Sequence, residues 1–274
     1  MPVIIISSDL YQTGREVAES VASVLGYDFL GREILEKVAV KYMVSETELA
    51  RALDDRPSFL RRSRGIRSRY LAYIQEATLS ELLKGNTVCQ GLAAHLYVLG
   101  VSHVLRVRIL SDFDKRADKY AAERGISLNK AQKLLDRERN DQRRWSVDAF
   151  QLDETDPSHY DLVIGLSQID LDEAVKIITE TAGYPRFKPM TYSINCMEDL
   201  ALSSGVKAAL LDRFPNIRVY ADRGTLVIET FGLKRQKEKK VRAIKDLARE
   251  IPGVEYVEVH VMNPIFHQAS ASFH

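Results

Sequence analysis

The sequence is poor in cysteine and has no long apolar run. Its 274 residues include two cysteines, Cys89 and Cys196. Two cysteines cannot build the disulfide framework of a secreted domain, so a reducing cytoplasm is the expected compartment. No apolar run approaches the roughly 20 residues that a membrane-spanning helix needs. Residues 1–6 lack the basic start and long apolar core of a signal peptide. We therefore expect a cytoplasmic protein without a transmembrane segment.

Neither sign of charge is in excess, and common catalytic motifs are missing. Lys and Arg number 39 and Asp and Glu number 38, which leaves a formal net charge of +1. This balance gives no reason to expect binding to nucleic acid or to an anionic membrane through overall charge. The six histidines show no HExxH-like spacing, and no cysteine stands at zinc-site spacing from them. No G-x-S-x-G nucleophile motif occurs. We predict no protein-bound metal.

Strand-like and helix-like segments alternate through residues 1–182. Residues 3–6, VIII, have the pattern of a buried strand, and residues 14–25 carry apolar side chains at helical spacing. A strand, a loop and a helix in this order predict a βαβ unit and a parallel sheet. Further helices are expected at 32–43, from 45 onward, at 66–84, at 112–145 with a break at Gly125, and at 171–181. Further strands are expected at 87–90, 103–110 and 160–164.

The character of the sequence changes at Gly183. Residues 183–192, GYPRFKPMTY, contain two prolines and show no periodicity, which indicates a linker. Helices are then expected at 197–214 and 237–250, and strands at 217–220, 225–229 and 254–261, the first two joined by a hairpin turn. We therefore divide the chain into a domain at 1–182, a linker at 183–196, a small α/β domain at 197–262 and a tail at 263–274.

The stretch SSDLYQTGRE at residues 7–16 has the position of a phosphate-binding loop. Such a loop points successive backbone N–H groups at an anion beside a helix N-terminus, usually with the spacing G-x-x-x-x-G-K-[ST]. In this sequence the aligned span begins at Asp9, keeps Gly14 and has Arg15 in the place of the lysine. The match alone is weak, and an ordinary strand-to-helix turn is the alternative.

Over its first 182 or so residues the sequence resembles the cytidylate kinase-like family, a branch of the P-loop nucleoside monophosphate kinases. The family opening S-R-x-x-G-S-G-G-R-E-I corresponds to residues 7–17, and its motif G-R-G-A corresponds to GLAA at 91–94. The more specific matches are VLRVRILSDFDKR at 104–116, the segment 125–143 and DPSHYDLVI at 156–164. The resemblance implies a three-layer α/β domain with a parallel sheet and a helical lid, and ATP and Mg²⁺ as cofactors if the protein is active.

The sequence departs from the family pattern where the chemistry is expected. Tyr11 and Thr13 stand where the family has glycine, Gly31 replaces an aspartate and Leu92 replaces an arginine. A loop that needs positive φ accepts glycine freely, whereas bulky or β-branched residues are costly there. The aspartate and arginine replacements remove a carboxylate and a guanidinium, a fork-shaped phosphate donor. We interpret the stretch as a phosphate-loop position whose phosphate-binding chemistry is eroded.

The resemblance implies specific site residues. Catalytic roles fall to Arg15, Arg139 and Arg143, phosphate contacts to Thr13, Gly14, Arg15 and Arg137, and an acceptor-nucleotide contact to Arg32. Arg139 and Arg143 are spaced i, i+4 and share a helix face, as lid arginines that close over phosphates would. The alternatives are an exposed arginine at the start of a helix for Arg15 and a solvated, charged helix for the lid segment.

A second basic cluster precedes the helix expected at 66–84 and extends into its start. It consists of Arg56, Arg61, Arg62, Arg64, Arg67 and Arg69. In the family this region belongs to the monophosphate-binding arm. The alternatives are that the cluster binds an acidic partner or a nucleic acid, or that it is an exposed basic helix without a ligand. The only nearby aromatics are Phe59 and Tyr70, so a stacking platform for single-stranded nucleic acid is thin.

Residues 197–262 resemble the BON domain, a small module with two helices on a three-stranded sheet. The segments that carry this resemblance are DLALSSGVKAALLDRF, IRVYADRGTLVIETFG and KVRAIKDLAREIPGVEYVEVHV. BON domains are associated with envelope or phospholipid attachment and with ligand sensing. The alternative is a small domain used for packing or oligomerisation.

Two functions therefore stay open. The first is a degenerate cytidylate kinase-like protein that acts as a nucleotide- or anion-binding or regulatory module, with a ligand or partner at the BON-like domain. The second is an active ATP-dependent nucleoside monophosphate kinase with CMP as acceptor. In either case a nucleotide or another phosphate-bearing small molecule is the expected ligand. A homo-oligomer is left open.

Overall fold

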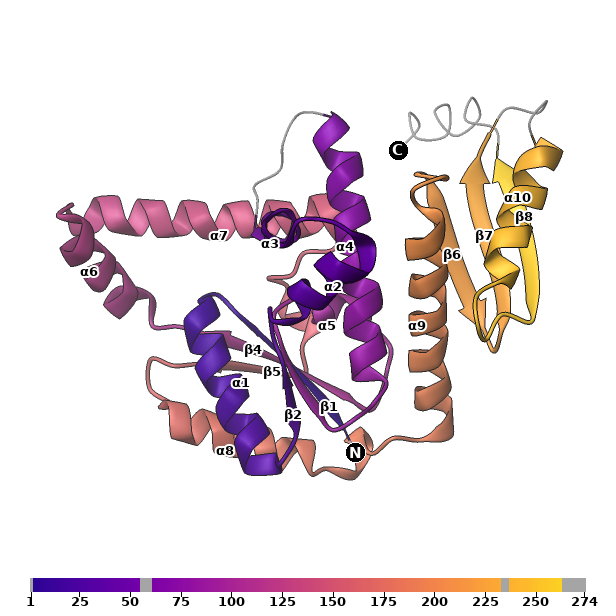
Figure 1. Ribbon diagram of the computed structural model, residues 1–274. Helices are drawn as coiled ribbons and strands as arrows, with labels where there is room; N and C mark the ends of the chain where they lie inside the picture. Colours follow the sequence, from indigo (N-terminus) through magenta and orange to yellow (C-terminus); the bar gives the residue numbers. More distant parts are fainter. Residues whose placement is uncertain (1, 55–60, 233–236, 263–274) are drawn as a thin grey trace.

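A parallel five-stranded sheet forms the centre of the first part of the chain (Figure 1). The computed structural model describes residues 2–54, 61–232 and 237–262, with the backbone alone for residues 61–64. The strand order is β2-β3-β1-β4-β5, and neighbouring strands are parallel, as the sequence predicted. The strands are β1 (Val3–Ser8), β2 (Asp28–Leu30), β3 (Thr87–Gln90), β4 (Val104–Leu110) and β5 (Leu162–Gly165).

Helices cover both faces of this sheet. Because successive side chains of a strand point to opposite faces, the run VIII can supply both layers at once. Ile4 and Ile6 pack with α1 (Tyr11–Leu25) and α8 (Leu171–Ala182) on one face. Val3 and Ile5 belong to the core on the other face. That second layer contains α2 (Ile34–Tyr42), α3 (Glu46–Asp54), α4 (Arg61–Leu82) and α5 (Ala94–Tyr97).

Two charged helices form an arm beside the sheet (Figure 1). They are α6 (Phe113–Arg124) and α7 (Leu128–Phe150). The predicted break at Gly125 is present, because this glycine has φ of 60° and its N–H donates to the last carbonyls of α6. Ser127 begins α7, and its hydroxyl accepts a hydrogen bond from the Lys130 N–H. Single 3₁₀ turns follow at Pro157–His159 and Pro185–Phe187.

The second part of the chain is a helix, a hairpin, a helix and a strand. Its elements are α9 (Thr191–Leu210), β6 (Ile217–Asp222), β7 (Thr225–Phe231), α10 (Lys237–Arg249) and β8 (Tyr256–Met262). β6 and β7 are antiparallel, whereas β7 and β8 are parallel. One side of this sheet packs on α9 and α10 around Leu226, Ile228 and Ile244. Within the described ranges, no helix is long and apolar enough to cross a membrane.

The segment expected to be a linker is shorter than predicted. α9 begins at Thr191 rather than at Met197, so the last part of the 183–196 segment is helical. Ser193 explains the early start, because its hydroxyl accepts a hydrogen bond from the Met190 N–H at 3.1 Å and its side chain is buried. Met197 is then fully buried in the core that contains α4. The early start of α9 was not predictable, because two prolines precede it and because tertiary contacts, rather than a local apolar periodicity, support its first turns.

Candidate functional site

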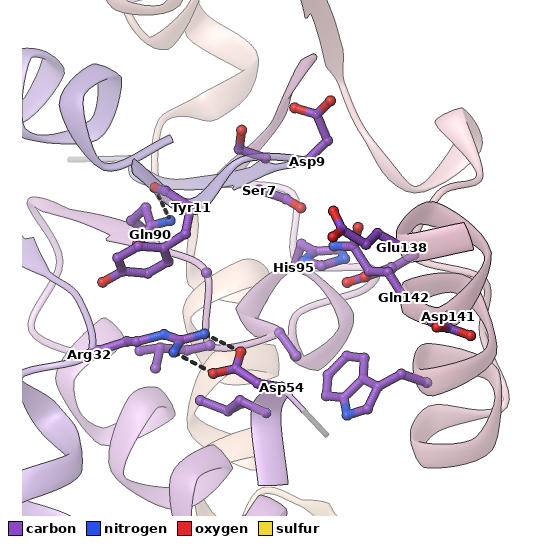
Figure 2. Close-up of a pocket in the computed structure, with 17 residues that line it drawn as sticks. Ser7, Asp9, Tyr11, Arg32, Asp54, Gln90, His95, Glu138, Asp141 and Gln142 are labelled. Carbon is purple, nitrogen blue, oxygen red and sulfur yellow. Dashed lines mark hydrogen bonds and ion pairs between the residues drawn. The ribbon is translucent and has the colours of Figure 1, made fainter. Parts of the chain in front are cut away.

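A cavity of about 380 Å³ opens at the carboxyl ends of β1 and β3, with α7 on its other side (Figure 2). The lining includes Ser7, Ser8, Asp9 and Tyr11, residues 90–93 with His95, and one face of α7. The end of α3 adds Leu53 and Asp54. Ligands of parallel α/β sheets bind at the carboxyl ends of the strands. This cavity is therefore the candidate site.

The connection between β1 and α1 consists of Asp9 and Leu10 only. Leu10 is extended, with φ of −126° and ψ of 115°, and α1 begins at the next residue. Tyr11 and Thr13 therefore lie in the first turn of the helix, and neither is among the described non-glycine residues that have positive φ. The strain that the sequence predicted for a glycine-poor loop is absent at these two positions because they are helical.

Gly14 has a packing role. Its N–H donates to the Leu10 carbonyl at 3.0 Å, inside the first turn of α1. A Cβ at this position would lie 2.6 Å from Cβ of Ser8, closer than real Cβ contacts. Glycine is thus required for the close approach of α1 to the end of β1. The N–H that the sequence assigned to a phosphate is already bonded to the protein.

Arg15 is held by neighbouring side chains at the start of α1. Its Nε donates to Glu19 Oε1 at 2.8 Å, and its terminal nitrogen lies 2.6 Å from Glu33 Oε1. The guanidinium carbon lies 5.4 Å from the centre of the Phe29 ring. Two carboxylates and a ring therefore hold the side chain at the start of α1, and Arg15 is not part of the cavity lining.

The lid arginines do not converge with Arg15. The Arg139 guanidinium lies over the Phe113 ring at 5.6 Å, Arg143 forms an ion pair with Asp153 at 2.6 Å, and Arg137 is exposed. The side chains of α7 that line the cavity are instead Glu138, Asp141, Gln142 and Trp145. These positions recur at helical spacing on one stripe, and the arginines lie on neighbouring stripes. The sequence showed that a charged helix was present, but not which of its faces meets the sheet.

Arg32 is the predicted cation that does line the cavity. Its guanidinium makes a two-pronged ion pair with both carboxylate oxygens of Asp54, with 2.6 Å between Nη1 and Oδ2 (Figure 2). The same group lies 4.6 Å from the centre of the Tyr11 ring. Asp54 was not predicted, because nothing in the sequence pairs it with a residue 22 positions earlier.

The floor of the cavity is organised by Arg108, which the sequence analysis did not select. Its Nη1 donates to Ser7 Oγ, to the Glu154 carbonyl oxygen and to Tyr160 Oη, at distances between 3.1 and 3.2 Å. Arg108 is buried, with 4% of its surface exposed. The signal that could have found it is the pair of arginines, Arg106 and Arg108, inside the mostly apolar strand pattern HVLRVRIL, since a buried cation needs built partners.

Three buried side chains bring polar atoms without hydrogen-bond partners to this lining. Within the described part of the chain, Gln90 Oε1, both ring nitrogens of His95 and Glu154 Oε1 have no partner. Their residues are 2%, 2% and 5% exposed, respectively. Burial raises the pKa of Glu154 to about 7, although the charge of Arg108 opposes that shift. Burial and then the charge of Arg108 lower the pKa of His95 to about 3, so the imidazole is neutral.

The backbone next to the cavity is strained. Gly91, Leu92 and Ala93 all have positive φ, at 71°, 58° and 58°. The left-handed conformation costs a residue with a Cβ roughly 1–2 kcal/mol, and such strain is concentrated at ligand sites. Leu92 replaces the arginine of the family motif, and it is buried against the cavity instead of presenting a charge.

The charge of the lining is mainly negative. Its carboxylates are Asp9, Asp54, Glu138, Asp141 and Glu154. In the described part of the chain, Arg32 is the only lysine or arginine of the lining. No group of three or more described His, Cys, Asp or Glu side chains has an arrangement that could hold a metal ion.

The second basic cluster is described only in part. Arg56 and the side chains of Arg61, Arg62 and Arg64 lie outside the described residues. Arg67 donates to the Ala52 carbonyl at 3.3 Å and pairs with Asp148 at 3.5 Å, and Arg69 pairs with Asp212 at 3.1 Å. The two described arginines thus bind other parts of this chain.

A parallel sheet covered on both faces, with a cavity at the carboxyl ends of its strands, defines a doubly wound α/β protein. The model of the cytidylate kinase-like family matches residues 3–168, more than half of the chain. The chain belongs to the cytidylate kinase-like family, which confirms the resemblance found in its first part. No curated protein shows significant similarity to the chain.

Three solved structures can be matched to about two thirds of the chain. An uncharacterized protein from Eubacterium ventriosum is 17% identical, with a TM-score of 0.46, and the match covers 66% of this chain and 98% of that protein's chain. The shikimate kinase from Bacteroides thetaiotaomicron is 9% identical, with a TM-score of 0.41 and coverages of 67% and 99%. The dephospho-CoA kinase from Campylobacter jejuni is 16% identical, with a TM-score of 0.33 and coverages of 65% and 96%.

Proposed function

We propose that this chain is a degenerate cytidylate kinase-like protein, a binding or regulatory module that does not transfer phosphoryl groups. The observation that carries the proposal is the connection between β1 and α1. A triphosphate needs a loop whose N–H groups converge on it. Here two residues connect the strand to the helix, and the Gly14 N–H is bonded inside that helix.

The family suggests ATP and Mg²⁺ as cofactors, but the residues at this site fit them poorly. Arg15 is held by Glu19 and Glu33 outside the cavity, and Arg32 is already paired with Asp54. The remaining charged side chains of the lining are carboxylates, which repel phosphate oxygens. A nucleotide would therefore bind weakly, with Arg32 as its main cationic contact.

The second part of the chain supports a binding role. Two helices on a three-stranded sheet agree with the BON resemblance of residues 197–262. In this proposal that part provides a ligand or partner contact, while the first part supplies the cavity. The sequence resemblance alone connects it with ligand sensing.

The alternative is an active cytidine monophosphate kinase. The observation in its favour is that α7 lies over the cavity in the place of a lid and that Arg32 reaches the cavity. For this function Arg32 would have to leave Asp54 and bind the acceptor nucleotide.

A coupled assay with ATP, Mg²⁺ and CMP, together with calorimetry of ATP binding, tests the proposal. We expect no turnover above the rate without protein and no ATP binding at micromolar concentration. Turnover that Arg32→Ala abolishes, and that the exposed-residue control Arg124→Ala leaves intact, would establish the kinase alternative and overturn the proposal.

A further inference from the structure

A second cavity, of about 610 Å³, lies where the two parts of the chain meet. α9 stands between α4 and β6 (Figure 1), and one stripe of α9 forms a wall of this cavity. Further walls come from the edge strand β6 and from residues 99–101, which follow α5. The volume falls within the range of roughly 300–1,000 Å³ that is typical of small-molecule sites. The cavity is therefore large enough for a ligand that contacts both parts.

Two cationic side chains line this cavity close to each other. Burial and then the charge of Arg218 on β6 lower the pKa of Lys207 on α9. Within the described ranges neither side chain has an ion-pair partner, although Glu229 lies opposite Arg218 in the ladder of β6 and β7. Outside those ranges the sequence has one further aspartate or glutamate, Asp55, which adjoins the end of α3. The two like charges repel each other, and an anion bound between them would stabilise both.

The one carboxylate among the described lining residues lies away from the two cations. Asp199 precedes Lys207 by eight residues in α9, which is about 12 Å along a helix axis. Asp199 Oδ1 already accepts a hydrogen bond from the Arg223 N–H at 2.7 Å. One end of the cavity is therefore cationic, and the carboxylate belongs to the other end.

The rest of the lining is largely apolar and draws on both parts of the chain. Its apolar and aromatic residues are Leu99, Val101, Tyr192, Leu200, Val219 and Tyr220. Tyr192 is 77% exposed and Tyr220 is 52% exposed, so both rings offer surface that a ligand can cover. An apolar group that removes such surface from water binds favourably. The lining thus joins a cationic end to apolar walls.

We propose that this second cavity binds a compact carboxylate with an apolar body, whose charged end is held by Lys207 and Arg218. The guanidinium of Arg218 can donate two parallel hydrogen bonds to a carboxylate, and the Lys207 ammonium adds a point charge. A single negative charge suits the site, because Lys207 stands in the last turn of α9, where the helix dipole opposes a more highly charged anion. The inference rests on the proposed function, which gives the second part of the chain a ligand contact, and it names the class of that ligand.

Calorimetry of the full chain with 3-phenylpropanoate as the probe tests the proposal. The probe should bind at a single saturable site. The uncharged 3-phenylpropanamide and the short acetate ion should each bind about tenfold or more weakly, because the first lacks the charge and the second lacks the apolar body. Lys207→Gln should weaken binding of the probe about tenfold or more, since a hydrogen bond to a charged group is lost. The control Arg249→Gln, which removes an exposed arginine at the end of α10, should leave the affinity unchanged.

A second variant protects the test against a folding defect. Arg218 is exposed, so Arg218→Gln should fold normally and should weaken binding of the probe by a smaller factor than Lys207→Gln does. If Lys207→Gln does not fold, Arg218→Gln decides alone. The proposal is overturned if the wild-type protein does not bind the probe, if the amide or acetate binds equally well, or if the folded variants bind the probe as the wild type does.

The outcomes separate this inference from the proposed function. If neither kinase turnover nor binding of 3-phenylpropanoate is found, the carboxylate site is wrong and the absence of phosphoryl transfer stands. If turnover is found and the probe also binds with the expected dependence on Lys207 and Arg218, the degenerate status of the first part is wrong and the carboxylate site stands. Turnover without binding of the probe rejects both.

Discussion

Glu154 and His95 are buried in the same floor, and burial shifts their pKa values in opposite directions. The pKa of Glu154 rises from 4.5 to about 7. Between these pH values the folded protein keeps a proton that the unfolded chain has released, so the free energy of unfolding falls as pH rises. The pKa of His95 falls from 6.5 to about 3, so between these pH values the unfolded chain binds a proton that the folded protein does not, and the free energy of unfolding rises with pH. Between pH 4.5 and 6.5 the two effects oppose each other. The charge of Arg108 disfavours a proton on either group, so it adds to the downward pKa shift of His95 and opposes the upward pKa shift of Glu154.

Glu154→Gln should uncover the His95 effect. The free energy of unfolding of the variant should rise more steeply with pH than that of the wild type between pH 4.5 and 6.5, by on the order of 1 kcal/mol per pH unit. Urea unfolding at three pH values in that range measures the slope. Glu123→Gln, which removes an exposed carboxylate, should follow the wild-type slope; an unchanged slope for Glu154→Gln would show that this carboxyl titrates normally.

At the scale of single residues, the sequence led to Arg32, which lines the cavity, and missed the floor of the cavity. The family resemblance pointed to Arg32, whereas Gln90, His95 and Glu154 are isolated polar residues whose neighbours lie far away in the chain. Their role depends on burial, which composition and spacing do not reveal. The arginines Arg15, Arg139 and Arg143 keep their assigned catalytic roles only as predictions, because the structure does not bring them together.

Among the elements, those with long or strongly apolar patterns were predictable. β3 was placed at its observed residues, and the strand and helix that open the chain were expected from the VIII run and its helical successor. The three-residue strand β2 and the four-residue helix α5 were not expected. Such short elements form because the sheet and the core hold them, and they carry too few residues for a periodic signal.

Because α1 begins at Tyr11, glycine at positions 11 and 13 should destabilise a helix rather than relax a loop. If Tyr11→Gly and Thr13→Gly are combined, both glycines enter a helical turn, so the variant should lose up to about 2 kcal/mol of stability. It should gain no ATP binding at micromolar concentration, because the connection from β1 remains two residues long. Thermal unfolding and calorimetry measure the two effects.

Gln12→Gly is the control within the same turn, because Gln12 is exposed. It should show the cost of one helical glycine and no change in nucleotide binding. Micromolar ATP affinity in the double variant would mean that side-chain bulk, and not the length of the connection, limits phosphate binding.

For the whole molecule, α4 and α9 join the two parts into one packed body (Figure 1). Ala72 of α4 belongs to the core of the second part, and Met197 of α9 belongs to the core of the first. Tyr73 and Arg69 of α4 both bond Asp212 beyond the end of α9. The sequence indicated a change of pattern at Gly183 but not a shared core, because the periodicity of a helix shows which of its faces is apolar and not what that face packs against.

Met197→Ala should therefore destabilise the whole molecule. The side chain is 1% exposed, and removing a buried methionine side chain costs about 2–5 kcal/mol because a cavity replaces its contacts. Since the cores are joined, unfolding should remain one transition, shifted to lower temperature or to lower denaturant concentration in both parts together.

The control Met190→Ala removes the same side chain where it is 69% exposed, and should change stability by less than about 0.5 kcal/mol. Fluorescence of Trp145 reports the first part and circular dichroism reports the whole chain. Two separate transitions in the Met197 variant, with the Trp145 signal unshifted, would show that the parts fold independently and that the contact between α4 and α9 contributes little.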